Sequence, residues 1–173
     1  MEIIFQRGFS NLKQEKIIIK RGEIAVSELT ILMTNISSCV SICMYNPEKK
    51  VGGITHISNS RNDDTTPSGR YIKKSGYHYT DEAIPGILSI FSEKYGITSP
   101  KKLHVIVAGG LTREGPIVEV LREIEKYHFT IAGMDIMRNL YRSVIFDPAR
   151  GIITIKRKTP FSEIKPVRTF TLL

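Results

Sequence analysis

The sequence contains little cysteine, no tryptophan and no long hydrophobic run, and two of these features exclude whole classes of protein. Two cysteines among 173 residues cannot form the disulfide framework of a small secreted domain. No stretch approaches the roughly 18 consecutive apolar residues that a membrane span requires. The segment from Met1 to Arg7 lacks an apolar region followed by a small-residue cleavage site. We therefore predict no secretory signal and expect a cytoplasmic protein without direct membrane insertion.

Acidic residues are also scarce relative to basic ones, with 25 Lys and Arg against 17 Asp and Glu and a net charge of +8. This excess favours an acidic partner or a solvated basic surface. The cations are spread along the chain in modest clusters at Lys73–Lys74, Lys101–Lys102 and Lys156–Lys158. Nucleic-acid binders usually gather their cations and interleave them with aromatic residues. We therefore predict no nucleic-acid partner.

What the sequence does contain is the hydrophobic patterning of a layered domain. Short β-branched or alternating runs predict strands, and two stretches with apolar residues on one helical face predict helices. The predicted strands cover 17–19, 23–26, 29–33, 39–45, 51–57, 103–108, 129–134, 143–146 and 152–156, and the helices 81–95 and 116–127. A long polar loop is predicted over 58–76 and an irregular tail from 159. About eight strands and two helices favour an α+β layered sandwich, a single domain over residues 1–173.

Two reactive side chains flank the hairpin predicted over 39–57, which reads CVSICMYNPEKKVGGITHI. If the chain turns at Pro47–Glu48, Cys39 and His56 come to the same end of two adjacent strands. A thiolate is a strong nucleophile, and a nearby imidazole accepts its proton. The pair is therefore a candidate nucleophile and base. The pattern leaves open a second interpretation, a buried core cysteine and a structural strand histidine, and we assign Cys43 to the core.

Five segments carry further motifs, in order along the chain. They are GEIAV at 22–26, SSCVSICMYNPEKKVGGITH at 37–56, YTDEA at 79–83, VAGG at 107–110 and RSVIFD at 142–147. Together they resemble the CheD family, the chemoreceptor glutamine deamidases, over about residues 17–157, with 158–173 left as a C-terminal tail. The resemblance implies a three-layer α/β/β sandwich. It also implies hydrolysis of selected receptor glutamines to glutamate with release of ammonia, without a metal or organic cofactor.

The resemblance assigns Cys39 as nucleophile and His56 as general base, and it implies a threonine that polarises the histidine. Ungapped counting from Cys39 puts Met33 at the threonine position and Thr34 one residue away. On a strand, an offset of one residue turns a side chain to the opposite face. Thr34 is therefore expected to orient His56 only if a bulge shifts it. The backbone around Ser38 is a candidate source of oxyanion donors, although serines there equally serve in turns.

The resemblance also implies partners. The substrates would be the cytoplasmic domains of chemotaxis receptors, and a CheC-type phosphatase would bind and regulate the protein. Since Met33 stands at the expected threonine position, a second hypothesis is a CheD-like adaptor that binds receptors or the phosphatase but turns over weakly.

Overall fold

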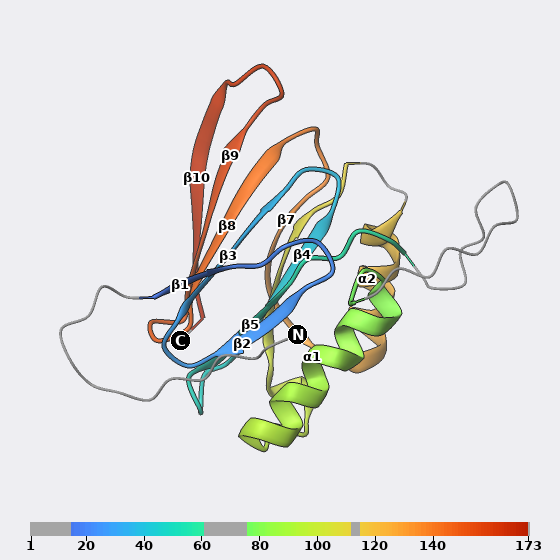
Figure 1. Cartoon of the computed structure of the whole chain (residues 1–173), viewed down its shortest axis with the longest axis vertical. Helices are drawn as coiled ribbons and strands as arrows, with labels where there is room; N and C mark the ends of the chain where they lie inside the picture. Colours follow the sequence, from blue (N-terminus) through green and yellow to red (C-terminus); the bar gives the residue numbers. More distant parts are fainter. Residues whose placement is uncertain (1–14, 61–75, 112–114, 173) are drawn as a thin grey trace, which may run out of the picture.

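The computed structural model describes residues 15–60, 76–111 and 115–172, and within them the chain forms ten strands and two α-helices (Figure 1). The strands are β1 (Lys16–Ile18), β2 (Ile24–Ser27), β3 (Ile31–Ile36), β4 (Val40–Asn46), β5 (Val51–Thr55), β6 (His104–Gly109), β7 (Thr130–Ile136), β8 (Tyr141–Asp147), β9 (Ile152–Lys158) and β10 (Ile164–Thr171). The helices are α1 (Thr80–Tyr95) and α2 (Pro116–Tyr127), and a 3₁₀ turn spans Pro100–Lys102.

The strands form two five-stranded sheets. The first sheet has the order β1-β3-β8-β9-β10, and the second has the order β2-β5-β4-β6-β7. Both helices pack on the second sheet, so that the layers run helices, second sheet, first sheet (Figure 1). The predicted three-layer α/β/β sandwich is therefore confirmed, with ten strands where about eight were expected.

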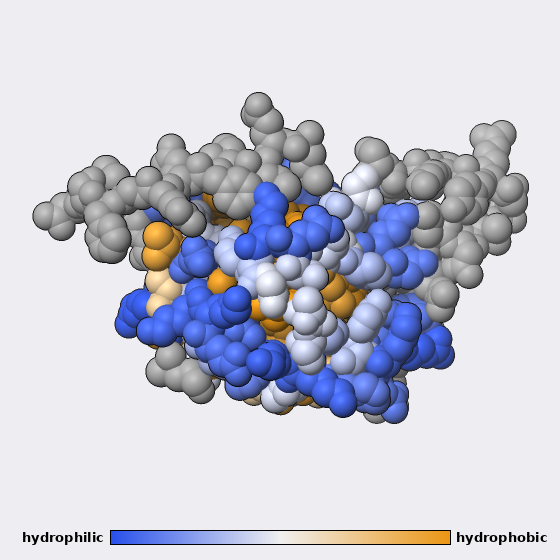
Figure 2. All heavy atoms as spheres, turned by 90° about the horizontal axis from the view of Figure 1, so that it is seen from below, coloured by the Kyte–Doolittle hydropathy of each residue, from blue (hydrophilic) through white to orange (hydrophobic). Residues whose placement is uncertain are grey.

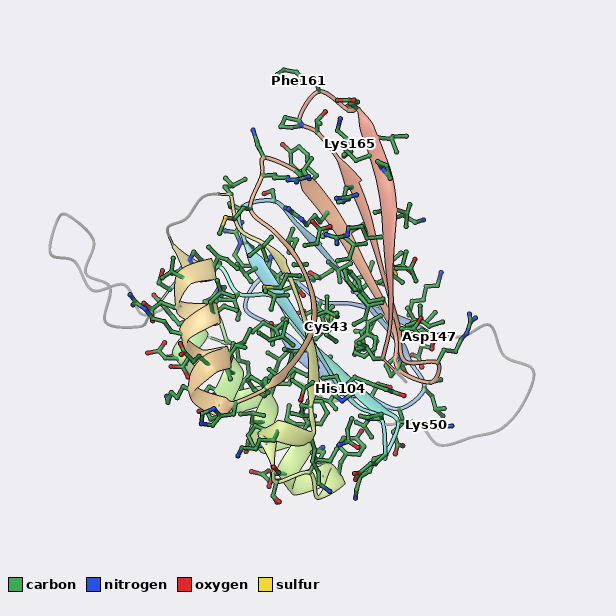
Figure 3. The ribbon with its side chains drawn as sticks, turned by 180° about the vertical axis from the view of Figure 1, so that it is seen from behind. Cys43, Lys50, His104, Asp147, Phe161 and Lys165 are labelled. Atoms are coloured by element: carbon green, nitrogen blue, oxygen red, sulfur yellow. The ribbon has the colours of Figure 1, made fainter. Side chains whose placement is uncertain are left out.

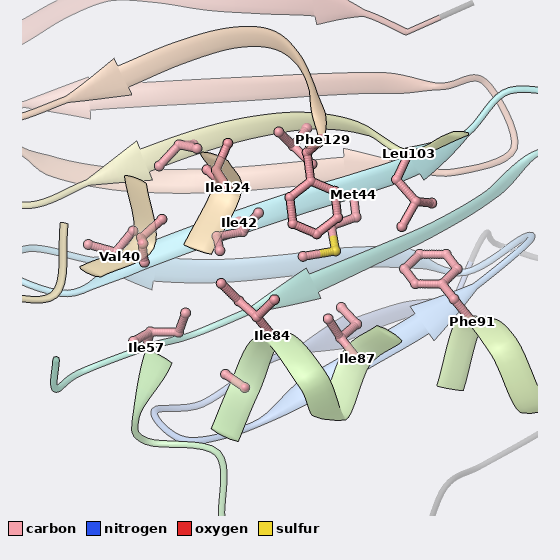
Figure 4. Close-up of a cluster of buried hydrophobic side chains, with 14 of the residues drawn as sticks. Val40, Ile42, Met44, Ile57, Ile84, Ile87, Phe91, Leu103, Ile124 and Phe129 are labelled. Carbon is pink, nitrogen blue, oxygen red and sulfur yellow. The ribbon is translucent and has the colours of Figure 1, made fainter. Parts of the chain in front are cut away.

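The central strands β4 and β5 of the second sheet are buried on both faces, and alternate residues of β4 serve two separate cores. The core beneath the helices takes Val40, Ile42 and Met44, together with α1 residues such as Ile87 and Phe91 (Figure 4). The core between the sheets takes Cys39, Cys43 and Tyr45. This division explains the unbroken burial of β4, because a strand covered on both faces has no solvent side.

The β4–β5 hairpin forms as the alternation predicts. Residues 47–50 make the turn, and the side-chain carbonyl of Asn46 accepts the backbone N–H of Lys49 at 2.8 Å. Antiparallel pairs run from Asn46 with Val51 to Cys43 with Ile54. The pairing resumes further along, where the backbones of Val40 and Ile57 exchange two hydrogen bonds of 2.9 and 2.8 Å. The two stretches of pairing are therefore in the same register, which holds as far as Val40, the residue after Cys39.

Two predictions about the irregular segments differ in outcome. The tail predicted from residue 159 is not irregular, because β10 pairs antiparallel with β9 and forms an edge of the first sheet. Most of the loop predicted over 58–76 lies outside the described residues. Seen from the lower end of the molecule, the described surface is mostly hydrophilic, with hydrophobic side chains showing between its polar parts (Figure 2).

Candidate active site

Cys39 lies in the bend that carries the chain from β3 in the first sheet to β4 in the second sheet. Its carbonyl accepts the backbone N–H of Gly110 at 3.0 Å, and the next residue, Val40, is held by the pair with Ile57. The residue is 6% exposed, whereas its neighbour Ser38 is exposed. The thiol therefore sits just below the surface, on backbone that two strands hold in place.

The end of β6 approaches this backbone closely, and only glycine allows the approach. Gly109 has φ +110°, and a Cβ built on it would lie 2.1 Å from the carbonyl oxygen of Cys39. Any other residue would therefore have to push the bend away or adopt a strained conformation. The VAGG motif thus has a structural explanation, because its first glycine fits against the backbone of the candidate nucleophile.

His56 follows the end of β5 and faces the core between the sheets. Its backbone N–H donates to the carbonyl of Glu23 at 3.2 Å, and its carbonyl accepts the N–H of Gly22 at 2.9 Å, which extends the pairing of β2 with β5. The pairs Val40–Ile57 and Cys43–Ile54 place His56 diagonally across from Cys39. Both side chains are on the same face of the second sheet, and diagonal neighbours are within reach of an aromatic side chain.

Thr34 contacts the imidazole from the opposite sheet. Its Oγ1 lies 2.8 Å from His56 Nδ1, and its hydroxyl donates to the carbonyl of Ile19 at 2.8 Å. A threonine hydroxyl has a single proton to donate. Because that proton is engaged by Ile19, Oγ1 accepts from Nδ1–H, and the tautomer is assigned. The lone pair of the ring is then on Nε2, the nitrogen that a general base needs.

The contact shows that the chain contains the shift on which the expectation for Thr34 depended. Along β3, Leu32, Thr34 and Ile36 are buried toward the second sheet, while Met33 is only half-buried and lies on the other face. The ungapped count from Cys39 failed because residues 37–39 form a bend. The alternation of faces holds only within a strand, and a bend interrupts it.

The surroundings of His56 keep its ring neutral. The side chain is almost fully buried, and this burial lowers the pKa of His56 below its ordinary value, against the opposing effect of the Ile19 carbonyl. The positive charge of Arg21 lowers the pKa further. A neutral imidazole with a free Nε2 is able to accept a proton at neutral pH.

The other predicted residues differ in their surroundings. Among the described residues, no hydrogen bond engages the backbone N–H of Ser38 or Cys39, so both amides are available as donors. Cys43 is buried, and burial raises the pKa of its thiol. Both cysteines are free, as predicted. Cys43 is therefore a neutral core thiol, and Cys39 is the cysteine at the surface-proximal end of the strand.

Ser58 and His78 are next to the site, and neither was predicted from the sequence as a site residue. Ser58 follows Ile57 on the segment that pairs with Val40, and its Oγ lies 3.3 Å from His78 Nδ1. The His78 ring packs on Gly22, where a Cβ would come within 2.4 Å of Nε2. The YHYT sequence contains the histidine but gives no signal of this contact, because residues 61–75 separate it from the hairpin in sequence.

A buried ion pair stabilises the far side of the site. Asp135 of β7 lies 3.6 Å from the guanidinium of Arg142 in β8, and both side chains are almost fully buried. Arg142 also donates to the carbonyls of Leu140 and Met137, which belong to the β7–β8 connection. Met137 in turn donates its N–H to the carbonyl of Gly109 at 2.9 Å. Arg142 is thus linked through this connection to the glycine that packs on Cys39.

Two classes of feature are not found in the part of the chain that the structure describes. No group of three or more His, Cys, Asp or Glu side chains there is arranged to hold a metal ion. Neither α1 nor α2 is long and apolar enough to cross a membrane.

The site thus brings a thiol, a neutral imidazole and a threonine hydroxyl together at one end of two facing sheets, which defines a candidate cysteine–histidine–threonine centre. Comparisons with known proteins find several proteins of similar sequence. The chain is 27% identical over 151 residues to a probable chemoreceptor glutamine deamidase CheD of Desulforamulus reducens, covering 78% of this chain and 84% of that protein. It is 23% identical over 170 residues to the corresponding protein of Geobacillus kaustophilus, covering 91% and 99%.

A third relative, the probable chemoreceptor glutamine deamidase CheD 1 of Shewanella oneidensis, is 23% identical over 163 residues, with 86% and 72% covered. These similarities, at 23–27% identity over most of the chain, support a divergent member of the CheD family. No family model matches it. Among solved structures, the hypothetical protein YfiH of Bacillus licheniformis is similar, with a TM-score of 0.37 and 12% identity over 60% of this chain and 39% of that one.

Proposed function

We propose that this protein is a protein-glutamine deamidase that hydrolyses selected glutamine side chains of chemotaxis receptors to glutamate. The observation that carries the proposal is the contact of Thr34 with His56. The imidazole of His56 lies on the same face of the second sheet as Cys39. Relatives that match most of the chain are named as probable chemoreceptor glutamine deamidases, which supports the same reaction. A CheC-type phosphatase as regulatory partner and a cytoplasmic location belong to this proposal as well.

In the proposed reaction, Nε2 of His56 takes the proton of the Cys39 thiol, and the sulfur attacks the carboxamide carbon of the glutamine. The electron pair of the C=O bond moves to the oxygen and forms a tetrahedral oxyanion. The backbone N–H groups of Ser38 and Cys39 are the proposed donors to that oxyanion, a kind of contribution worth several kcal/mol when well aligned. The Nδ1–H group keeps its hydrogen bond to Thr34 Oγ1, and this bond stabilises the positive charge that the imidazole gains.

The oxyanion then collapses and the C–N bond breaks. The amide nitrogen leaves as ammonia with the proton that His56 returns, and a thioester remains on Cys39. The same imidazole then takes a proton from water, whose oxygen attacks the thioester carbon. Collapse of the second tetrahedral intermediate breaks the C–S bond, regenerates the thiol and releases glutamate.

The adaptor hypothesis has a weaker basis once the contacts of Thr34 are known. It depended on Met33 occupying the place of the histidine-polarising threonine, whereas Thr34 makes that contact. The test is incubation of a receptor cytoplasmic fragment with the protein, followed by ammonia and peptide-mass measurements. We expect ammonia release and the mass increase that replacement of NH₂ by OH produces, with loss of both in Cys39→Ala and their retention in Cys43→Ala. Binding of the fragment without any mass change would favour the adaptor.

A further inference from the structure

A groove of about 590 Å³ lies on the first sheet, at the end where β3 leads into the bend of Cys39. The ladder registers explain how it is built: Asn35, Ser143 and Lys156 form one row across β3, β8 and β9, and Tyr141, Lys158 and Ile164 form another across β8, β9 and β10. Because the row of Ile36 and Arg142 between them is buried, the side chains of these two rows lie on the outer face of the first sheet. Both helices cover the other sheet and leave this face open (Figure 1).

The groove combines cationic and apolar groups. Lys158 Nζ lies 5.8 Å from the centroid of the Tyr141 ring, and Tyr141 itself is 46% exposed. Ile164, which lines the groove, is 83% exposed, and Phe161, outside the lining at the tip of the β9–β10 hairpin, is 94% exposed (Figure 3). Exposed large apolar residues at one end of a sheet are unusual unless another molecule covers them. The apolar contribution to the groove therefore indicates a protein ligand rather than a simple ion.

The charge of the groove specifies the ligand further. Among the described residues that line it, several are basic and none is acidic. Arg157 faces inward and lies 3.6 Å from Asp135, a carboxylate that two further arginines also approach, so its guanidinium is engaged inside the protein and we do not assign it to the ligand. In the described chain, neither Lys156 nor Lys158 forms an ion pair. Two uncompensated ammonium groups beside apolar side chains fit a partner with carboxylates next to leucine-like residues.

We propose that this groove docks an acidic polypeptide segment, with its carboxylates at Lys156 and Lys158 and its apolar side chains on Tyr141 and Ile164. Ser37, the first residue of the bend that carries Cys39, lines the same groove. The groove therefore ends two residues before the candidate nucleophile in the chain. The inference rests on the proposed function for one point only, that the docked segment belongs to the protein whose glutamine is hydrolysed.

The experiment uses the full chain and a fluorescein-labelled synthetic helical peptide with Glu on one face and Leu on the other. The variant Lys156→Glu/Lys158→Glu is compared with Lys50→Glu/Lys101→Glu, which changes the net charge equally at exposed residues outside the groove. We expect anisotropy titrations to show about tenfold weaker binding for the first variant and less than a twofold change for the control. Tyr141→Ala/Ile164→Ala should weaken binding without altering its dependence on salt.

Equal weakening in both charge variants would overturn the proposal, because it would show attraction to net charge alone. Tighter binding of duplex DNA than of the acidic peptide, with a steep fall in salt, would also overturn it in favour of a nucleic-acid surface. The proposed function fails separately. If peptide binding depends on Lys156 and Lys158 but the protein deamidates nothing, the docking groove is supported and the proposed reaction is contradicted. If the groove variants leave deamidation unchanged, the proposed reaction is supported and the docking of its substrate in the groove is contradicted.

Discussion

Thr34→Val is the substitution that examines the proposed centre most closely. Valine has nearly the same shape as threonine, so packing between the sheets is retained while both hydrogen bonds of the hydroxyl are lost. The Ile19 carbonyl and Nδ1–H of His56 are then left buried without this partner. An unsatisfied buried group costs about 1–3 kcal/mol, so we expect the free energy of unfolding to fall by about 2–4 kcal/mol in urea titrations.

The effect of Thr34→Val on catalysis has a separate physical cause. Without Thr34 Oγ1 the imidazole loses the acceptor that fixes its tautomer, and Nε2 is no longer reserved as the base. A positioned base contributes about 10²–10⁴-fold, and we expect kcat to fall about ten- to a hundredfold. Thr34→Ser is the matched control, because it keeps both hydrogen bonds and loses only a methyl group. Equal turnover by the valine and serine variants would refute the assigned role of Thr34.

The remaining predictions concern the buried charges and the second thiol. Arg142→Met should lower the free energy of unfolding by about 1–3 kcal/mol, because Asp135 loses its most deeply buried cation but keeps Arg157 at 3.6 Å, and Arg142→Met/Asp135→Asn should recover part of the loss. His56 has a pKa below its ordinary value of 6.5, so the unfolded chain takes up its proton first as the pH falls. The contribution of the neutral His56 ring to stability is therefore fully present above pH 6.5 and should decline below it. His56→Gln should flatten this decline in pH-dependent urea titrations. Cys43→Ala should leave turnover unchanged and lower stability by only about 1 kcal/mol.

The sequence predicted the part of the site that local rules control. The turn after Asn46 was enough to bring Cys39 and His56 to the same end of a hairpin, whereas their shared face follows only from the register of β4 with β5. Side-chain parity and turn geometry are properties of a few neighbouring residues, so they are readable before any tertiary contact is known.

The misplacement of Thr34 and the overlooked contact of Ser58 with His78 have a different origin. Each depends on how separate segments meet: Thr34 reaches His56 from the other sheet, across a bend that interrupts the count of faces. β10 was missed because Pro166 and a register shift between Lys165 and Arg168 disturb its alternation. A proline and a bulge are features of an edge strand, and in the sequence they look like an irregular tail.

The central claim is that the imidazole of His56 activates the sulfur of Cys39, and alkylation of the two cysteines tests it without any substrate. Iodoacetamide labelling at pH 7, followed by peptide mass analysis, reports Cys39 and Cys43 separately in the same sample. The account predicts that Cys39 is labelled much faster than Cys43, and that His56→Ala slows Cys39 about tenfold or more while leaving Cys43 unchanged. Equally slow labelling of both cysteines, or a Cys39 rate that His56→Ala does not change, would contradict it.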